Sequence, residues 1–155
     1  MQNPNGRIIF DTVKQFFTGD NWPFTQAEGE PVLQMAFEGT HGRWMCFAQA
    51  REDAQQIIFY SVSPVIVPDE KRQAMAEFLT RANYGLIIGN FEMDFDDGEM
   101  RYKTGIDVEG AEPNTELIRS LAYANVMTMD RYLPGALSVI YGDASPAEAI
   151  SKLED

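Results

Sequence analysis

Three runs along the chain alternate apolar and polar residues with the two-residue period of a half-buried β-strand: residues 32–38, 43–51 and 56–62. The third run is also rich in β-branched and aromatic residues, which favour strands. Residues 39–42 (Gly-Thr-His-Gly) and the polar pair Glu52-Asp53 separate the three runs. Because these turns are short, we expect the neighbouring strands to pair antiparallel.

Apolar residues spaced three and four positions apart predict helices in the remaining segments. The first helix covers residues 7–18, and the second begins at Pro68 and carries its apolar stripe through residues 74–82. Residues 20–30 fit neither period, so we expect a loop there that Trp22 and Phe24 pin to the core.

A long helix is predicted to open at residues 113–115, with Asn114 or Thr115 as its N-terminal cap, and to end at Gly142. Pro134 lies inside this stretch and lacks the N–H that a helix interior uses, so we expect a kink or a break near residues 130–133. The sequence Ser-Pro-Ala-Glu at residues 145–148 is typical of a helix start and predicts a short last helix.

Asp97-Gly98 lies between two more alternating runs, residues 86–96 and 99–109, and is typical of a two-residue hairpin turn. In that register the apolar pairs share one face: Phe95–Met100, Met93–Tyr102 and Phe91–Thr104. The other face would hold the oppositely charged pairs: Asp94–Arg101 and Glu92–Lys103. One register therefore separates the apolar pairs from the charged pairs, although it also sets Asp96 against Glu99.

The predicted order of elements is α-β-β-β-α-β-β-α-α, which is an α+β fold with an antiparallel twisted sheet of about five strands and flanking helices. A chain of 155 residues fits one domain. We therefore expect a single domain over residues 1–155, with residues 1–6 and 154–155 frayed.

The charge of the chain restricts its partners. It has 24 acidic and 12 basic residues and a formal net charge of −12, which repels nucleic acid and anionic membrane surfaces. Cys46 is the only cysteine, so no intramolecular disulfide is possible. With no secretory pattern at the start and no apolar run of spanning length, we expect a cytoplasmic protein.

The residue types that carry catalysis form no recognisable constellation. His41 is the only histidine, and we interpret it as a solvated turn residue. Cys46 lies among apolar neighbours in a predicted strand, which favours a buried and unreactive thiol. The sequence contains neither a phosphate-binding glycine loop with its lysine nor a Gly-x-Ser-x-Gly elbow.

One acidic segment, with Asp94, Asp96, Asp97 and Glu99, is a weak candidate for a cation site. Its spacing departs from the calcium-loop pattern, and the hairpin turn explains the same residues better. Most of the eight methionines fall inside predicted elements. They fit either core filling or an adaptable protein-binding surface.

The chain resembles the YbjN-domain family in three stretches: Phe78–Gly85, Gly89–Asp94 and Gly98–Lys103. A fourth stretch, Met129–Pro134, looks like the last long helix of that family. The resemblance covers most of the chain after residue 30. It implies a fold similar to type III secretion chaperones, commonly dimeric. Members are described as sensory transduction regulators, and the family supplies no catalytic residues.

The leading hypothesis is a non-enzymatic protein-binding module, chaperone-like or regulatory in signal transduction. We expect a protein partner, a homodimer and no cofactor. The alternative is a small-molecule or metal-binding sensor that uses the acidic turn.

Overall fold

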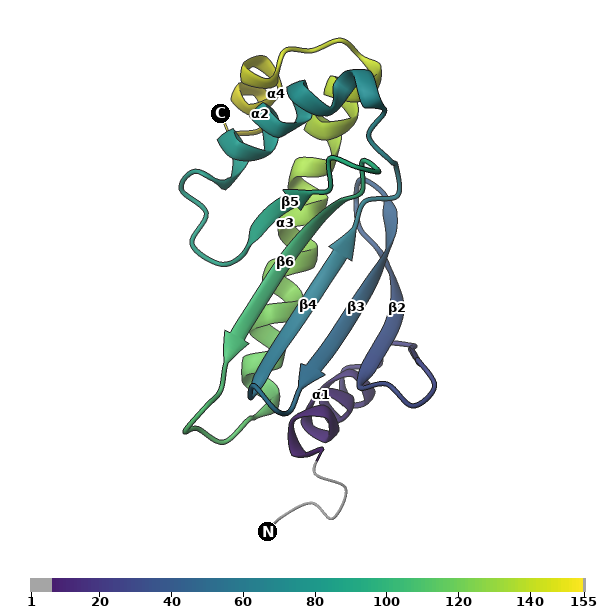
Figure 1. The fold of residues 1–155 in the computed structure, drawn as a ribbon, viewed down its shortest axis with the longest axis vertical. Coiled ribbons are helices and arrows are strands. Elements are labelled where there is room, and N and C mark those ends of the chain that lie inside the picture. Colours follow the sequence, from purple (N-terminus) through teal and green to yellow (C-terminus); the bar gives the residue numbers. More distant parts are fainter. Residues whose placement is uncertain (1–6, 155) are drawn as a thin grey trace.

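The computed structural model describes residues 7–154 and shows four α-helices and a six-stranded antiparallel sheet with the order β1-β2-β3-β4-β6-β5 (Figure 1). The strands are β1 (Thr25–Gln26), β2 (Val32–Glu38), β3 (Arg43–Arg51), β4 (Gln56–Val62), β5 (Asn90–Met93) and β6 (Met100–Asp107). The helices are α1 (Ile8–Gly19), α2 (Arg72–Asn83), α3 (Thr115–Tyr141) and α4 (Pro146–Glu154), with a 3-10 turn, η1 (Asp69–Lys71), before α2. The predicted α+β class is confirmed, with one more strand than expected.

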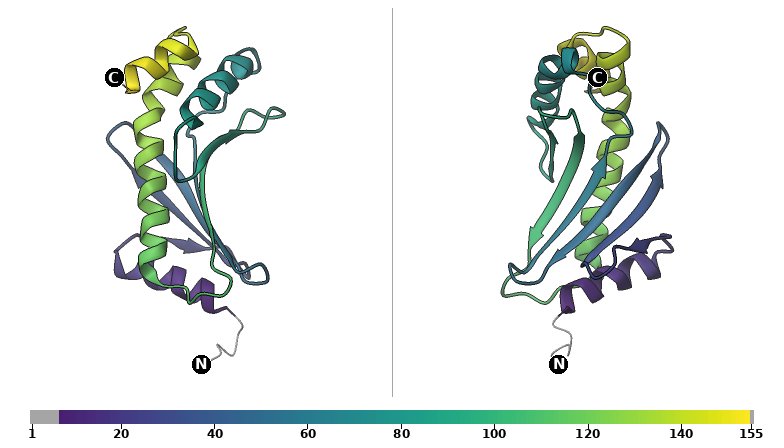
Figure 2. Two further views of the ribbon diagram at one scale, coloured as in Figure 1. Left: turned by 90° about the vertical axis from the view of Figure 1, so that its left-hand side faces the viewer. Right: turned by 45° about the vertical axis from the view of Figure 1, so that its right-hand side comes forward.

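The helices lie on one side of the sheet. Helix α3 crosses that face along β4 and β6, and α1 packs at the end of the sheet opposite to α2 and α4 (Figures 1 and 2). Phe17 of α1 stacks on Phe59 of β4, with ring centroids 5.9 Å apart. Helices α2 and α4 pack on the other end of α3, with α2 beside β5. No helix of the described chain covers the opposite face of β2, β3 and β4.

The three central strands begin and end at the residues that the alternation predicted. The structure adds β1, whose Thr25 and Gln26 pair with Gln34 and Leu33 of β2 inside the segment predicted as a loop. A strand of two residues is too short to show a period. Trp22 and Phe24 pack against the core, as predicted for that segment.

The predicted two-residue turn at Asp97-Gly98 is wrong. Phe91 pairs with Tyr102 rather than Thr104, and Met93 pairs with Met100, so the register differs by two residues and residues 94–99 form a longer connection. Because the shift is even, every strand residue keeps its predicted face. Phe95, expected in the apolar row, is 50 % exposed, and the predicted contact of Asp96 with Glu99 has no place in this register.

Side chains and one glycine fix this longer turn. The side-chain oxygens of Asp94 and Asp97 accept the backbone N–H groups of Asp96 and Glu99, each at 2.8 Å. Gly98 has φ of +79°, and its carbonyl accepts the N–H of Val67 at 2.9 Å. Local carboxylates and a contact from a distant segment therefore outweigh the preference of Asp-Gly for a two-residue turn.

Helix α3 is continuous from Thr115 to Tyr141, so the predicted break near residues 130–133 is wrong. Pro134 has no N–H for the Asp130 carbonyl one turn earlier. The His41 ring supplies the missing donor, because its Nδ1 lies 3.0 Å from that carbonyl oxygen. A carbonyl only accepts hydrogen bonds, so Nδ1 carries a proton in this contact. Asn114 caps the start of α3, as predicted, by accepting the N–H of Leu117 at 3.0 Å.

Candidate functional site

The side chains of the sheet that point away from the helices form a surface that we call the open sheet face. Its apolar members are Val32, Ala36, Met45, Phe47, Ile58, Tyr60 and Val62. Across β3 and β4, Met45 lies opposite Val62 and Phe47 lies opposite Tyr60. Met45 is 39 % exposed and the aromatic pair is half-buried. The solvated face of an antiparallel sheet is usually polar, so this apolar row is unusual.

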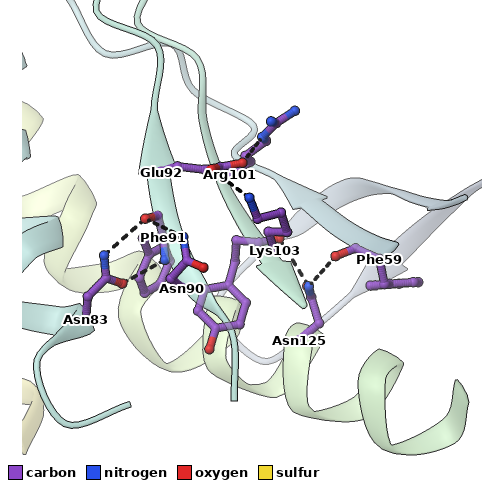
Figure 3. Close-up of polar contacts among 9 residues, drawn as sticks. Phe59, Asn83, Asn90, Phe91, Glu92, Arg101, Lys103 and Asn125 are labelled. Carbon is purple, nitrogen blue, oxygen red and sulfur yellow. Dashed lines mark hydrogen bonds and ion pairs between the residues drawn. The ribbon is translucent and has the colours of Figure 1, made fainter. Parts of the chain in front are cut away.

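Charged residues of β5 and β6 border the apolar row. The Glu92 carboxylate lies 2.6 Å from Nε of Arg101 and 3.2 Å from Nζ of Lys103 (Figure 3). The Arg101 guanidinium also lies 4.3 Å from the centroid of the Tyr60 ring. Partial burial works to raise the pKa of Glu92, but the hydrogen bonds from the two cations together outweigh it, and the pKa falls below its ordinary value.

A hollow of about 580 Å³ opens on this face above Gly105, which we call the Gly105 hollow. Ile58 and Tyr60 line it on the apolar side, and its charged lining consists of Arg51, Lys103 and Asp107. A Cβ at Gly105 would meet the Ile57 carbonyl oxygen at 3.4 Å, an ordinary contact. The absence of a side chain therefore opens the hollow, and local packing does not require it.

A second exposed apolar surface is the α2–β5 loop, residues 84–89. Tyr84 is 91 % exposed, Ile87 is 89 % exposed and Ile88 is 52 % exposed. Residues 83–91 contain no charged side chain. Monomeric proteins seldom leave large apolar side chains this exposed in one short segment, so the loop is a candidate contact surface.

Beside this loop, Asn83 covers part of the free edge of β5. Its Oδ1 accepts the N–H of Phe91 at 2.7 Å, and its Nδ2 donates to the Phe91 carbonyl at 3.1 Å (Figure 3). A neighbouring strand would make the same two bonds. The side chain thus satisfies the edge at the point where another chain could pair.

The acidic turn holds the four weak candidates for a cation site together, but two of its carboxylates already serve the backbone. Asp94 and Asp97 each accept an N–H within the turn, as described above. Asp96 and Glu99 complete the turn as exposed or half-exposed residues. Within residues 7–154, no group of three histidine, cysteine or acidic side chains is placed to hold a metal ion. Nothing in the turn therefore favours the sensor alternative.

The two residues with nucleophilic or acid–base potential have structural surroundings. Cys46 is fully buried, and desolvation raises the pKa of its thiol to about 11, so the thiol is protonated near neutral pH. His41 lies in the predicted turn but is not simply solvated, since its ring contacts Asp130 and its backbone N–H donates to the Asp130 carboxylate at 2.8 Å. Both residues stabilise the fold at these positions.

A polar contact in the core was not predicted. Asn125 of α3 is fully buried, and its Nδ2 donates to the carbonyls of Phe59 at 2.9 Å and Tyr102 at 3.1 Å (Figure 3). These bonds tie α3 to β4 and β6 and fix how the helix crosses the sheet. No helical period marks this residue, because an asparagine inside a helix usually faces solvent.

Sequence reasoning also missed both apolar surfaces. The open sheet face had a signal, since residues 43–51 carry apolar side chains on both sides, with Met45 and Phe47 opposite Trp44 and Cys46. Residues 86–89 of the α2–β5 loop fall inside the run of residues 86–96 that the Asp97-Gly98 turn signal predicts as a strand. The structure ends that run with left-handed glycines on either side, Gly85 at φ +93° and Gly89 at φ +80°.

None of the helices in residues 7–154 is both long enough and apolar enough to span a bilayer.

The YbjN family, whose description reads "Putative bacterial sensory transduction regulator", matches residues 10–137. The crystal structure of YbjN from E. coli has a TM-score of 0.60 at 13 % identity, covering 84 % of this chain and 87 % of that chain. A chain of the HopA1–SchA chaperone–effector complex has a TM-score of 0.53 at 11 % identity, covering 83 % of this chain and 94 % of that chain. No curated protein matches by sequence. The expected chaperone-like fold is confirmed, and this chain belongs to the YbjN family.

Proposed function

We propose that this protein is a non-enzymatic module that binds other proteins, in a chaperone-like or regulatory role, and that it acts as a homodimer. The observation that carries the proposal is the exposure of the α2–β5 loop, where Tyr84 and Ile87 are 91 % and 89 % exposed. Such a segment gains free energy when a second protein surface removes it from water.

The comparisons support the protein-binding part of this proposal. The family is described as a regulator of sensory transduction, and one solved structure of the same fold belongs to a chaperone–effector complex. The surroundings of the two residues with catalytic potential support a non-enzymatic role. The Cys46 thiol is buried with a pKa of about 11, and the His41 ring is bound to α3.

Charge favours the α2–β5 loop as the place where two copies meet. Each copy carries a net charge of −12, so two copies repel one another over most of their surface. A two-fold contact sets the same segment of both copies against itself, which requires a self-complementary surface. The uncharged, apolar loop meets that requirement, because it brings no like charges together.

Sedimentation equilibrium of the wild type, Ile87→Asp and Met127→Asp tests the homodimer. Met127 is 62 % exposed on α3, so its change adds the same charge outside the loop and serves as the matched control. We expect a dimer for the wild type and the control and a monomer for Ile87→Asp. A wild type that stays monomeric at all concentrations refutes the homodimer, and a dimeric Ile87→Asp refutes the loop as its interface.

A further inference from the structure

The open sheet face has the composition of a buried surface, although no described helix covers it. A contiguous apolar area extends across β3 and β4 and consists of Met45, Phe47, Ile58, Tyr60 and Val62. A helix is the usual cover for such a face in an α+β domain, and α3 covers the other face in this way. The open sheet face therefore fits a helix that this chain does not supply within residues 7–154.

Two cations without a carboxylate partner in residues 7–154 mark the ends of this area. Arg43 and Arg51 are the first and last residues of β3, and both are exposed. Neither guanidinium lies within ion-pair distance of a carboxylate in residues 7–154, although Glu38 lies opposite Arg43 in the register. The other two cations of the face, Arg101 and Lys103, are already bound to Glu92. Arg51 donates from Nη1 to the neutral Oε1 of Gln56 at 3.2 Å, so its charge, like that of Arg43, is not neutralised by that contact. Carboxylates of a partner would complement both charges.

The spacing of these cations sets the length of the partner segment. Eight residue steps along an antiparallel strand separate Arg43 from Arg51, which corresponds to about 27 Å at 3.4 Å per residue. An α-helix rises 1.5 Å per residue, so a helix of about 18 residues spans the same distance. The Gly105 hollow, about 580 Å³ beside Ile58 and Tyr60, offers a seat for one large side chain of that helix.

A second copy of this chain fits the open sheet face less well. A two-fold contact through β3 would bring Arg43 and Arg51 of one copy against the same two cations of the other. A helix with carboxylates near both ends brings opposite charges to those arginines instead.

We propose that the open sheet face binds an amphipathic helix of another protein, about 18 residues long, with one apolar side and carboxylates near both ends. This inference rests on the proposed protein-binding function but uses a surface separate from the α2–β5 loop. It therefore stands or fails independently of the homodimer.

Fluorescence anisotropy with two synthetic helical peptides tests the proposal on the full chain. The peptides share one apolar stripe and differ only at their ends, which carry glutamates in one and lysines in the other. We expect the glutamate-ended peptide to bind at least about tenfold more tightly. Attraction by the overall charge of −12 predicts the opposite order, so the comparison separates the proposed contact from non-specific binding. Equal or reversed affinities overturn the proposal, as does no binding of either peptide at about 1 mM.

Two variants locate the contact. Gly105→Val fills the hollow with a residue that favours strands, so we expect an unchanged or higher melting temperature and about tenfold weaker binding. The double variant Arg43→Glu, Arg51→Glu should reverse the peptide preference. Hydrogen exchange with bound peptide should protect β3 and β4 rather than the α2–β5 loop. Unchanged binding by Gly105→Val, an unreversed preference, or protection confined to the loop each overturns the proposal.

Discussion

Gly98 and Gly110 form a matched pair in which the surroundings of a left-handed glycine can be measured. Their φ angles are +79° and +77°, so alanine suffers nearly the same backbone strain at both positions. A Cβ at Gly110 would meet nothing within 4 Å, whereas a Cβ at Gly98 would lie 2.1 Å from the Val67 carbonyl oxygen. The difference between the two alanine variants therefore measures what the close contact of Gly98 with Val67 adds to the backbone strain.

The strain of a left-handed alanine costs about 1 kcal/mol, which is the whole effect expected for Gly110→Ala. At Gly98 the chain around Val67 must also move, and the bond from the Val67 N–H to the Gly98 carbonyl, 2.9 Å long, is weakened. Losing that bond and repacking the segment add about 2 kcal/mol. We expect Gly98→Ala to lower the free energy of unfolding by about 3 kcal/mol in total.

Urea unfolding followed by tryptophan fluorescence measures both variants, because Trp22 and Trp44 pack in or against the core. For a chain of this size, the expected change at Gly98 corresponds to a fall of about 10 °C in melting temperature, against about 3 °C for Gly110→Ala. Equal losses of unfolding free energy for the two variants would show that Gly98 does not lie against Val67. The observed turn of residues 94–99, and the β5–β6 register that depends on it, would then be refuted.

Three further perturbations test other contacts. Hydrogen bonds from Arg101 and Lys103 hold the pKa of Glu92 below its ordinary value of 4.5. The ionised Glu92 carboxylate therefore stabilises the fold fully above pH 4.5, and this stabilisation is lost as the pH falls through the lowered pKa. Acid titration of unfolding should therefore weaken the wild type more than Glu92→Gln between about pH 5 and pH 3, and parallel curves would contradict the ion pairs. Alkylation of Cys46, whose thiol has a pKa of about 11, should proceed only at the rate of unfolding, and fast labelling of the folded protein would refute its burial. Asn83→Ala removes the acceptor of the Phe91 N–H and one of the two donors to the Phe91 carbonyl, the other being Nδ2 of Asn90 at 3.2 Å. It should therefore cost about 1–2 kcal/mol and speed exchange of the Phe91 amide, whereas unchanged exchange would refute the edge contact.

The alternation of apolar and polar residues determined much of the fold. The strands β2, β3 and β4 have the predicted bounds because each has one buried face, and burial of that face selects the two-residue period. Helix α3 likewise has the predicted ends, with Asn114 as its cap. These features depend on local spacing and on the residues that flank it, which a sequence displays directly.

The sequence alone did not determine contacts between distant segments. The register of β5 with β6 depends on Val67 meeting Gly98, and the continuity of α3 through Pro134 depends on a histidine in the β2–β3 turn. The apolar side chains of Met45 and Phe47 were visible in the sequence, but only the tertiary structure shows that no described helix covers them. Periodicity reports which residues share a face, whereas the arrangement of whole elements decides which face is covered and which is left for a partner.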